Sequence, residues 1–271
     1  MYILAITPSP KPDVNYTVGI VDHGVLDKSV ISVIMPVYNV SGIVQRSIRV
    51  VESIMKKHGY KYEIIVVDDG SVDDTYYHAL KASHNPNIRV YRLPRNMGKG
   101  FALLYGFKKS KGDIIVFFDG DLDIHPYQII LLINTLKHNN ADVVITCKWH
   151  PESRTIASLP RKFLSRSFYA LTRLLLGLRV NDTQTGAKAF KREVLEDIVD
   201  GLTVKRYAFD VELLTAVTAG KYRIIEVPAL GKIKLTSKFK IQEIIKMLID
   251  LLAITYRHRI KKQYSSIKNK K

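Results

Sequence analysis

The sequence contains little cysteine and no long hydrophobic run. Cys147 is the one cysteine among 271 residues, which excludes a framework of disulfides within the chain and suits a reducing compartment. No apolar run approaches the roughly 18–20 residues that a helix needs to cross a bilayer, so we expect no transmembrane segment. Residues 1–9 have no basic stretch before their short apolar one, and we therefore expect no cleaved secretory signal.

Acidic residues are scarce relative to basic ones. The chain has 42 Lys and Arg against 25 Asp and Glu, a formal net charge of +17. Such an excess attracts phosphates of any kind, in nucleic acid, anionic lipid or nucleotides, so charge alone does not choose among these partners. With 46% hydrophobic and 25% charged residues, the composition is that of a globular protein and excludes wholesale disorder.

Short apolar runs rich in β-branched residues alternate with helical patterns in the first half of the chain. We expect strands at 31–37, 63–67, 88–93, 114–118 and 141–146, and helices at 41–57, 73–83, 98–110 and 126–138. This alternation predicts an α/β, Rossmann-like fold, with a mainly parallel sheet covered by helices on both faces. The carboxyl ends of parallel strands then share one edge, where ligands bind in such sheets.

The patterns divide the chain into three parts. We expect a loose N-terminal extension at 1–29, one α/β domain at 30–238, and an amphipathic helix with a basic tail at 239–271. The second half of the domain is less regular. There we expect helices at 158–177, 192–199 and 210–219, an edge strand at 186–190 and another strand at 222–227.

Acidic side chains collect after two of the expected strands: Asp68, Asp69, Asp119, Asp121 and Asp123. Such residues also favour turns and helix N-termini, but carboxylates that converge on one edge repel one another unless a cation lies among them. Asp119-Gly120-Asp121 offers hard oxygen ligands, which Mg²⁺ or Mn²⁺ binds together with a substrate's phosphates. An ion there would act as a Lewis acid for a departing diphosphate.

Seven short motifs carry a resemblance to a known family. Four belong to the first half: PVYN at 36–39, VVDDGS at 66–71, RNMGKG at 95–100 and DGDLD at 119–123. Three lie downstream: DTQTGAK at 182–188, FDVELL at 209–214 and TSK at 236–238. Over residues 31–238 the chain resembles the inverting family 2 glycosyltransferases of GT-A fold, and within them the dolichyl-phosphate glucose and mannose synthases. The resemblance implies a GT-A domain at 30–238.

The resemblance also implies a role for each matching residue. The nucleotide's base and ribose would be held by Pro36, Tyr38, Val67 and Asp69. The rest of the donor would be held by Lys99, Asp119, Gly120 and Asp121, with Lys232 and Lys238 closing over the diphosphate. The metal, Mg²⁺ or Mn²⁺, would bind Asp119 and Asp121. Catalysis would fall to Asp121, Asp123 and Lys148, and the lipid phosphate would be received by Arg161 and Ser165.

The implied reaction moves a hexose, from UDP-glucose or GDP-mannose, to dolichyl or another polyprenyl phosphate. A phosphate monoester arrives already ionised near neutral pH, so it needs cations to position it rather than a strong base. Residues 148–179 supply several cations and no acidic residue after Glu152, which favours such an acceptor. Two alternatives stay open. One is transfer to a hydroxyl of a glycan or glycolipid with Asp210 or Glu212 as base, and the other is nucleic-acid binding through the net charge.

A polyprenyl acceptor stays in the bilayer, so the chain would have to reach a membrane surface. Apolar residues recur at helical spacing between 241 and 252, as in a helix that either faces the core or lies in the headgroup plane. The basic residues beyond 256, and a second helix that combines Phe163 and Phe168 with Lys and Arg, favour contact with anionic lipid. We therefore expect peripheral attachment to the cytoplasmic face of a membrane, and no nucleic-acid partner.

Overall fold

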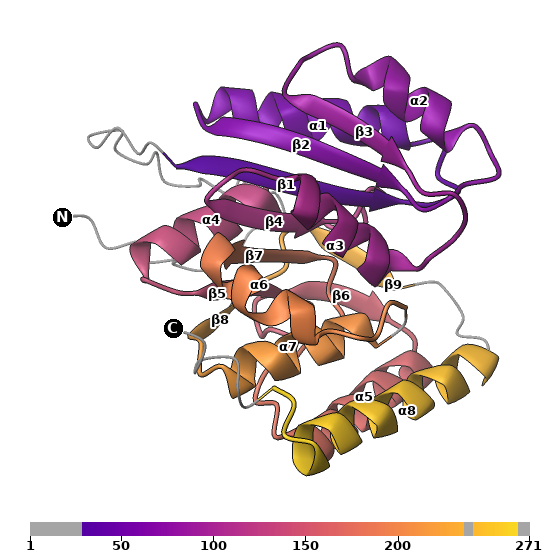
Figure 1. The fold of residues 1–271 in the computed structure, drawn as a ribbon, viewed down its shortest axis with the longest axis vertical. Helices are drawn as coiled ribbons and strands as arrows, with labels where there is room; N and C mark the ends of the chain where they lie inside the picture. The colour runs from indigo at the N-terminus through magenta and orange to yellow at the C-terminus, as the bar shows by residue number, and fades with distance from the viewer. Residues whose placement is uncertain (1–28, 207, 236–240, 265–271) are drawn as a thin grey trace.

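The computed structural model describes residues 29–206, 208–235 and 241–264. Its main feature is a seven-stranded sheet in the order β3-β2-β1-β4-β7-β5-β8 (Figure 1). The strands are β1 (Val30–Val37), β2 (Lys61–Asp68), β3 (Ile88–Arg92), β4 (Ile114–Phe118), β5 (Val143–Cys147), β7 (Ala187–Lys191) and β8 (Ile224–Pro228). All neighbouring strands pair in parallel except β7, which is antiparallel to β4 and β5. The predicted α/β fold with a mainly parallel sheet is confirmed.

Helices cover both faces of this sheet, as predicted. They are α1 (Val44–Lys57), α2 (Thr75–Ala82), α3 (Lys99–Lys109), α4 (Gln128–His138), α5 (Leu159–Leu176), α6 (Arg192–Ile198), α7 (Phe209–Ala219) and α8 (Ile241–Thr255). Alternate side chains of a strand point to opposite faces. Ile34 of β1 therefore belongs to the core cluster to which α3, α6 and α7 contribute on one face, and Val33 to the cluster to which α1, α2 and α4 contribute on the other. Burial on both faces explains why β1, β4 and β5 are almost purely apolar.

Two features of the second half differ from the prediction. The segment expected as an edge strand at 186–190 is β7, which lies between β4 and β5, while β3 and β8 form the edges. Lys188 makes the segment look like an edge strand in the sequence, but its side chain is buried and paired with Asp210. In addition, β6 (Arg154–Ala157) and β9 (Lys232–Leu235) form a small parallel sheet that is absent from the prediction, since both segments are short and contain charged residues.

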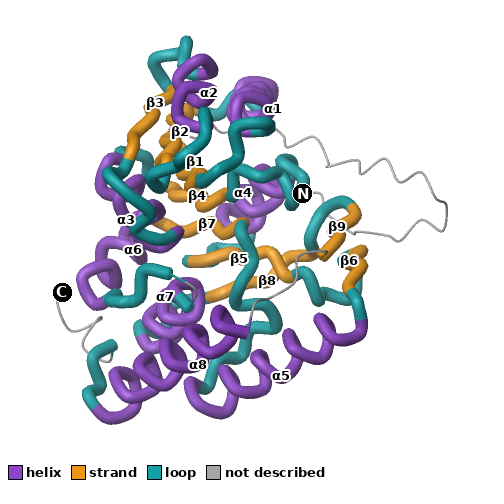
Figure 2. The backbone as a smooth tube through the Cα atoms, turned by 90° about the vertical axis from the view of Figure 1, so that its right-hand side faces the viewer, coloured by secondary structure: helices purple, strands orange, loops and turns teal. Residues whose placement is uncertain are grey.

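The last helix packs against the body of the protein on one side. Met247, Leu251 and Ile254 of α8 are buried in the core, whereas Ile249 and Leu252 are exposed. Figures 1 and 2 both show α8 beside α5, and a π-helical turn (Tyr256–Ile260) follows it. None of the helices in the described ranges is both long enough and apolar enough to span a bilayer.

Candidate active site

The expected metal-binding pair lies where β4 ends, and a lysine already contacts its first member. Asp119 directly follows β4, and its carboxylate oxygens lie 2.7 Å and 2.8 Å from Nζ of Lys99, the first residue of α3. Burial opposes the charge on Lys99, but Asp119 and Asp210 outweigh burial and raise the pKa of this lysine above its ordinary value. The structure thus brings two predicted donor-site residues together as an ion pair.

The next two carboxylates lie in an exposed turn beyond Asp119. Asp121 accepts the backbone N–H of Asp123 at 3.0 Å, and Leu122 between them has a left-handed φ of 59°. Desolvation and the negative charge of Asp119 raise the pKa of the Asp121 carboxyl. The proximity of Asp119 and Asp121 therefore costs free energy, and a cation between them would recover it.

Close packing holds the Asp119–Asp121 turn in place. The Ser47 hydroxyl donates to the carbonyl of Gly120 at 2.7 Å, which ties the turn to α1. A Cβ on Gly186, just before β7, would lie 1.9 Å from Oδ2 of Asp119. Glycine at 186 therefore makes room for the Asp119 carboxylate, so the DTQTGAK segment shapes the same site as the DGD segment.

Asp69 holds the loop that leads into α3. Its two carboxylate oxygens accept the backbone N–H groups of Met97 at 2.7 Å and Gly98 at 2.9 Å. Burial raises the pKa of Asp69, although these hydrogen bonds and the nearby Arg206 oppose that effect. Asp69 therefore fixes the backbone on which Lys99 stands, and its predicted contact with a nucleotide remains a prediction.

The other predicted nucleotide-binding residues lie at the carboxyl ends of β1 and β2. Pro36 and Val67 are register partners in these two strands, and Val67 is fully buried. Tyr38 follows β1 and is 43% exposed, so its ring is accessible to a ligand at this edge.

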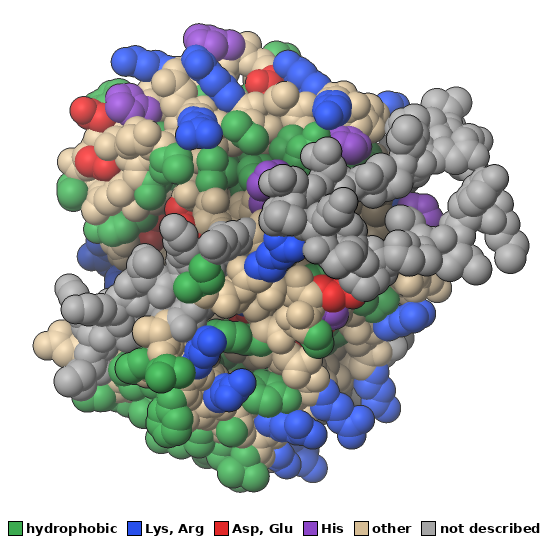
Figure 3. All heavy atoms as spheres, turned by 180° about the vertical axis from the view of Figure 1, so that it is seen from behind, with side chains coloured by type: hydrophobic (Ala, Val, Ile, Leu, Met, Phe, Trp, Pro, Cys, Tyr) green, Lys and Arg blue, Asp and Glu red, His purple; other side chains and the backbone are tan. Residues whose placement is uncertain are grey.

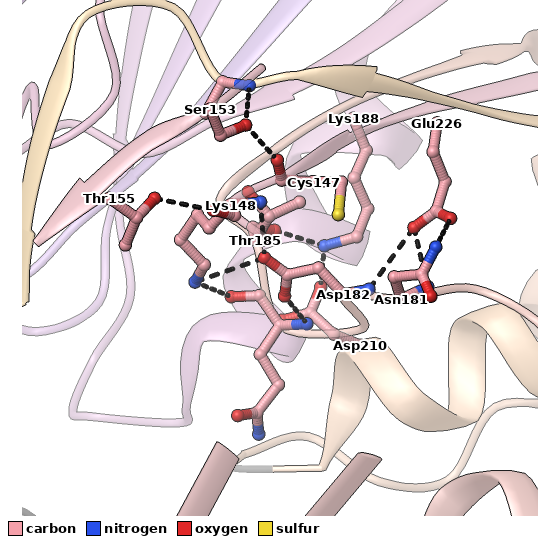
Figure 4. Close-up of polar contacts among 12 residues, drawn as sticks. Cys147, Lys148, Ser153, Thr155, Asn181, Asp182, Thr185, Lys188, Asp210 and Glu226 are labelled. Atoms are coloured by element: carbon pink, nitrogen blue, oxygen red, sulfur yellow. Dashed lines mark hydrogen bonds and ion pairs between the residues drawn. The ribbon is translucent and has the colours of Figure 1, made fainter. Parts of the chain in front are cut away.

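A second group of charged side chains lies around the carboxyl end of β5 and the start of β7 (Figure 4). Lys188 donates to Oδ1 of Asp210 at 2.7 Å and also to the carbonyl of Thr185. Burial opposes the charge on Asp210, but Lys188 and Lys99 outweigh burial and lower the pKa of that carboxyl. Asp210 thereby connects this group electrostatically with Lys99 and Asp119.

Lys148 belongs to the same group. Its backbone N–H donates to Oδ2 of Asp182 at 3.0 Å, and its Nζ lies 3.8 Å from the same oxygen. The Nζ also lies 3.4 Å from the carbonyl of Gln184, so the ammonium points toward the DTQTGAK segment (Figure 4). Glu226 of β8 supports that segment by accepting backbone N–H groups of Asn181 and Asp182.

The remaining predicted residues are described only in part. Ser165 lies half-buried on α5. The backbones of Arg161 and Lys232 lie in α5 and β9, but their side chains are outside the described part of the protein, as are Lys238 and residues 1–28 and 265–271.

The importance of Gly186 and Lys188 was missed at the level of individual residues. Both belong to the DTQTGAK motif, which signalled the segment but not its contacts with Asp119 and Asp210. Lys188 looks like a solvent-facing strand residue until the neighbouring strands and α7 are placed around it.

Comparison with known proteins identifies the family. Residues 32–199 match the sequence profile of Glycosyl transferase family 2. The chain belongs to this family. This glycosyltransferase is 30% identical over 265 residues to a dolichyl-phosphate beta-glucosyltransferase of Trichomonas vaginalis, covering 93% of the chain and 77% of the relative. It is also 30% identical over 203 residues to the glycosyltransferase AglD of Haloferax volcanii, but that match covers 73% of the chain and only 32% of AglD.

Solved structures of other glycosyltransferases share the fold. Mannosyl-3-phosphoglycerate synthase from Rubrobacter xylanophilus aligns with a TM-score of 0.67 at 18% identity, covering 87% of this chain and 76% of that one. Glucosyl-3-phosphoglycerate synthase from Mycobacterium tuberculosis, in complex with Mn²⁺, UDP and glucosyl-3-phosphoglycerate, aligns with a TM-score of 0.63 at 24% identity, covering 84% and 79%. These likenesses confirm the expected GT-A fold of this family 2 enzyme.

Proposed function

We propose that this glycosyltransferase moves a hexose from a nucleoside diphosphate sugar to the phosphate of dolichol or another polyprenol. The observation that carries the proposal is the Asp119–Asp121 turn at the end of β4, with Lys99 in direct contact with Asp119. A carboxylate pair and an ammonium group at this edge suit a diphosphate that binds with a divalent cation. The names of the 30% identical relatives support the lipid phosphate as acceptor.

The residues present fit a divalent ion, Mg²⁺ or Mn²⁺. Asp119 and Asp121 offer only hard carboxylate oxygens. Desolvation, together with the negative charge of Asp119, raises the pKa of Asp121, and a cation beside the two carboxylates would offset both effects. No group of three or more His, Cys, Asp or Glu that could hold a metal occurs among the described residues. Two carboxylates agree with an ion that completes its coordination with phosphate and water oxygens. When bound, the ion supplies Lewis-acid stabilisation of the departing diphosphate.

UDP-glucose is the donor that we favour, with GDP-mannose as the alternative. Support comes from the relatives named as beta-glucosyltransferases and from the fold shared with a glucosyl-3-phosphoglycerate synthase in complex with UDP and Mn²⁺. Tyr38 would face the base and ribose, while Lys99 would contact the diphosphate.

The contacts of the two candidate bases, Asp210 and Glu212, also favour a phosphate acceptor over a hydroxyl. A phosphate oxygen attacks the anomeric carbon, the bond from that carbon to the diphosphate oxygen breaks, and the negative charge moves to the diphosphate without a proton transfer. A hydroxyl acceptor would need a free base. Asp210 is paired with Lys188, and buried Glu212 accepts hydrogen bonds from Thr203, Val204, Arg257 and Tyr264. Neither carboxylate is therefore available as the base that the alternative requires.

Lys148 and α5 would position the acceptor phosphate. The ammonium of Lys148 lies beside Asp182. Arg161 and Ser165 belong to α5, the helix that comes next along the chain. Cations placed here attract the phosphate and orient it without removing a proton. Lysine at 148 supplies a point charge rather than the planar fork of arginine.

Support for a membrane surface comes from α5 and α8. Arg259 donates to the backbone carbonyls of Leu174 and Leu175 at the end of α5, so the two helical segments are joined. Large hydrophobic side chains are exposed along both: Leu159, Phe163, Leu171, Leu174, Ile245, Leu248, Ile249 and Leu252. Figure 3 shows hydrophobic and basic side chains gathered at the lower end of the molecule, where Figure 1 places these helices. We propose that this surface, the α5–α8 face, meets anionic lipid on the cytoplasmic side of a membrane.

A transfer assay with separate donors and acceptors tests the proposal. The protein is incubated with radiolabelled UDP-glucose or GDP-mannose, Mg²⁺ or Mn²⁺, and either dolichyl phosphate or soluble glycans. We expect label in the organic phase with UDP-glucose and dolichyl phosphate only. Label on soluble glycans, or none in lipid with either donor, would refute the proposed acceptor.

A further inference from the structure

We infer that Lys99 couples the binding of the divalent cation to the binding of the nucleotide diphosphate, so that neither binds tightly alone. The inference rests on the proposed function and concerns how the two ligands of that site affect each other's binding. It follows from the position of the Lys99 ammonium, which contacts both carboxylate oxygens of Asp119 at 2.7 Å and 2.8 Å.

A divalent cation that approaches Asp119 must therefore compete with an ammonium already in place. Two positive charges a few ångströms apart repel each other by several kcal/mol at an effective dielectric near 20. Repulsion from Lys99 therefore weakens binding of the cation when no diphosphate is present.

The diphosphate relieves this competition. Four carboxylates and three ammonium groups interact in this region, so the cluster already carries slightly more negative charge than positive. They are Asp119, Asp121, Asp182 and Asp210, with Lys99, Lys148 and Lys188. A diphosphate alone adds negative charge, but a diphosphate with a divalent cation adds almost none. It also offers Lys99 phosphate oxygens as partners in place of Asp119.

The structure lets Lys99 change partner by moving its side chain alone. Asp69 holds the amides of Met97 and Gly98, and the N–H of Gly100 donates to the carbonyl of Lys205 at 3.0 Å. The backbone on both sides of Lys99 is therefore fixed. The Lys99 side chain itself is 37% exposed, which leaves its ammonium free to swing toward a ligand.

Binding of Mn²⁺ to the full chain, followed by the electron paramagnetic resonance signal of the free ion, tests the inference. We expect UDP to tighten Mn²⁺ binding by the wild-type protein about tenfold or more, and Mn²⁺ to tighten UDP binding by the same factor. In Lys99→Gln, Mn²⁺ alone should bind about tenfold tighter than to the wild type. UDP should still tighten Mn²⁺ binding, because the cation contacts the diphosphate directly, but by a smaller factor than in the wild type. Lys99→Arg keeps the charge and should keep most of the coupling.

Lys205→Gln is the matched control, because it removes one exposed positive charge near α3 from a side chain that lies over the Phe101 ring. It should retain the wild-type coupling. If wild-type protein binds Mn²⁺ equally with and without UDP, or if Lys99→Gln leaves Mn²⁺ binding without UDP unchanged, the inference is wrong. If no protein binds Mn²⁺ even with UDP, the metal site of the proposed function fails instead.

Discussion

Asp121 follows β4 in an exposed turn, where desolvation and the negative charge of Asp119 raise the pKa of its carboxyl. Asparagine has nearly the same shape and can still accept the N–H of Asp123, but it lacks the charge that a cation needs. We expect Asp121→Asn to lower kcat by about 100-fold or more with an unchanged melting temperature. Asp74→Asn, which neutralises an exposed carboxylate before α2, should keep full activity. Near-normal turnover by Asp121→Asn in excess Mg²⁺ would show that the metal is held elsewhere.

The charged carboxylate of Asp73 stabilises the fold. Its carboxylate accepts the N–H groups of Thr75 at 3.1 Å and Ser41 at 3.2 Å, so it stabilises the start of α2 and joins it to the loop before α1. Burial opposes its charge, but these hydrogen bonds dominate and lower its pKa to about 2.

We expect Asp73→Ala to reduce the free energy of unfolding by about 1 kcal/mol near pH 7. Because the folded pKa lies below the unfolded value, the stabilisation is complete above the unfolded pKa and is lost as pH falls toward the folded one. Urea denaturation should therefore show a constant gap between wild type and variant above about pH 5, narrowing from pH 4 toward pH 2. A gap that persists unchanged at the lowest pH would contradict this role.

At the scale of elements, the start of β7 and the end of β4 are shaped to fit each other. A methyl group at 186 would come 1.9 Å from the Asp119 carboxylate. The Asp119 side chain can rotate away from this methyl group more readily than the backbone of either strand can move. Gly186→Ala should therefore weaken Mn²⁺-dependent UDP binding and turnover by about tenfold or more, while lowering the melting temperature only slightly. Gly42→Ala, whose added methyl meets nothing within 4 Å, should behave as wild type in isothermal calorimetry. Unchanged UDP binding by Gly186→Ala would rule out this fit as a functional constraint.

The α5–α8 face carries the prediction about membranes. Phe163 is 75% exposed and Leu252 62% exposed, and burying one such side chain in lipid is worth about 1.5–3 kcal/mol. In cosedimentation with vesicles we expect binding when phosphatidylserine is present, weaker binding to neutral phosphatidylcholine, and a loss of about tenfold or more for Phe163→Glu or Leu252→Glu. Tyr77→Glu, at an exposed position on α2, should bind like wild type. Vesicle binding that survives both face substitutions would place the contact elsewhere.

At the scale of the whole molecule, much of the fold could be predicted from periodicity. β1, β2 and β4 are buried on both faces, so their sequences are continuous apolar runs that local reading detects. The position of β7 could not be predicted in this way, because insertion between β4 and β5 depends on pairings far apart in the chain. The same holds for β6 and β9, which pair across more than seventy residues.

Only part of the candidate site could be predicted from the sequence. Asp119 and Asp121 follow a buried strand, so the sequence predicted that they lie together at the carboxyl edge of the sheet. The Lys188–Asp210 pair joins a strand to a helix, and its burial becomes apparent only when the elements are packed together. Asp210 was considered as a base, and the structure instead shows its carboxylate engaged by a lysine.

In our interpretation, Asp119 and Asp121 bind a divalent cation that also contacts the diphosphate of the nucleotide. Crystals soaked with Mn²⁺ and UDP-glucose test it most directly through anomalous scattering from manganese. We predict an anomalous peak about 2.0–2.3 Å from a carboxylate oxygen of Asp121, in contact with the diphosphate, with the base near Tyr38. Nucleotide density without a manganese peak beside residues 119–121 would contradict it.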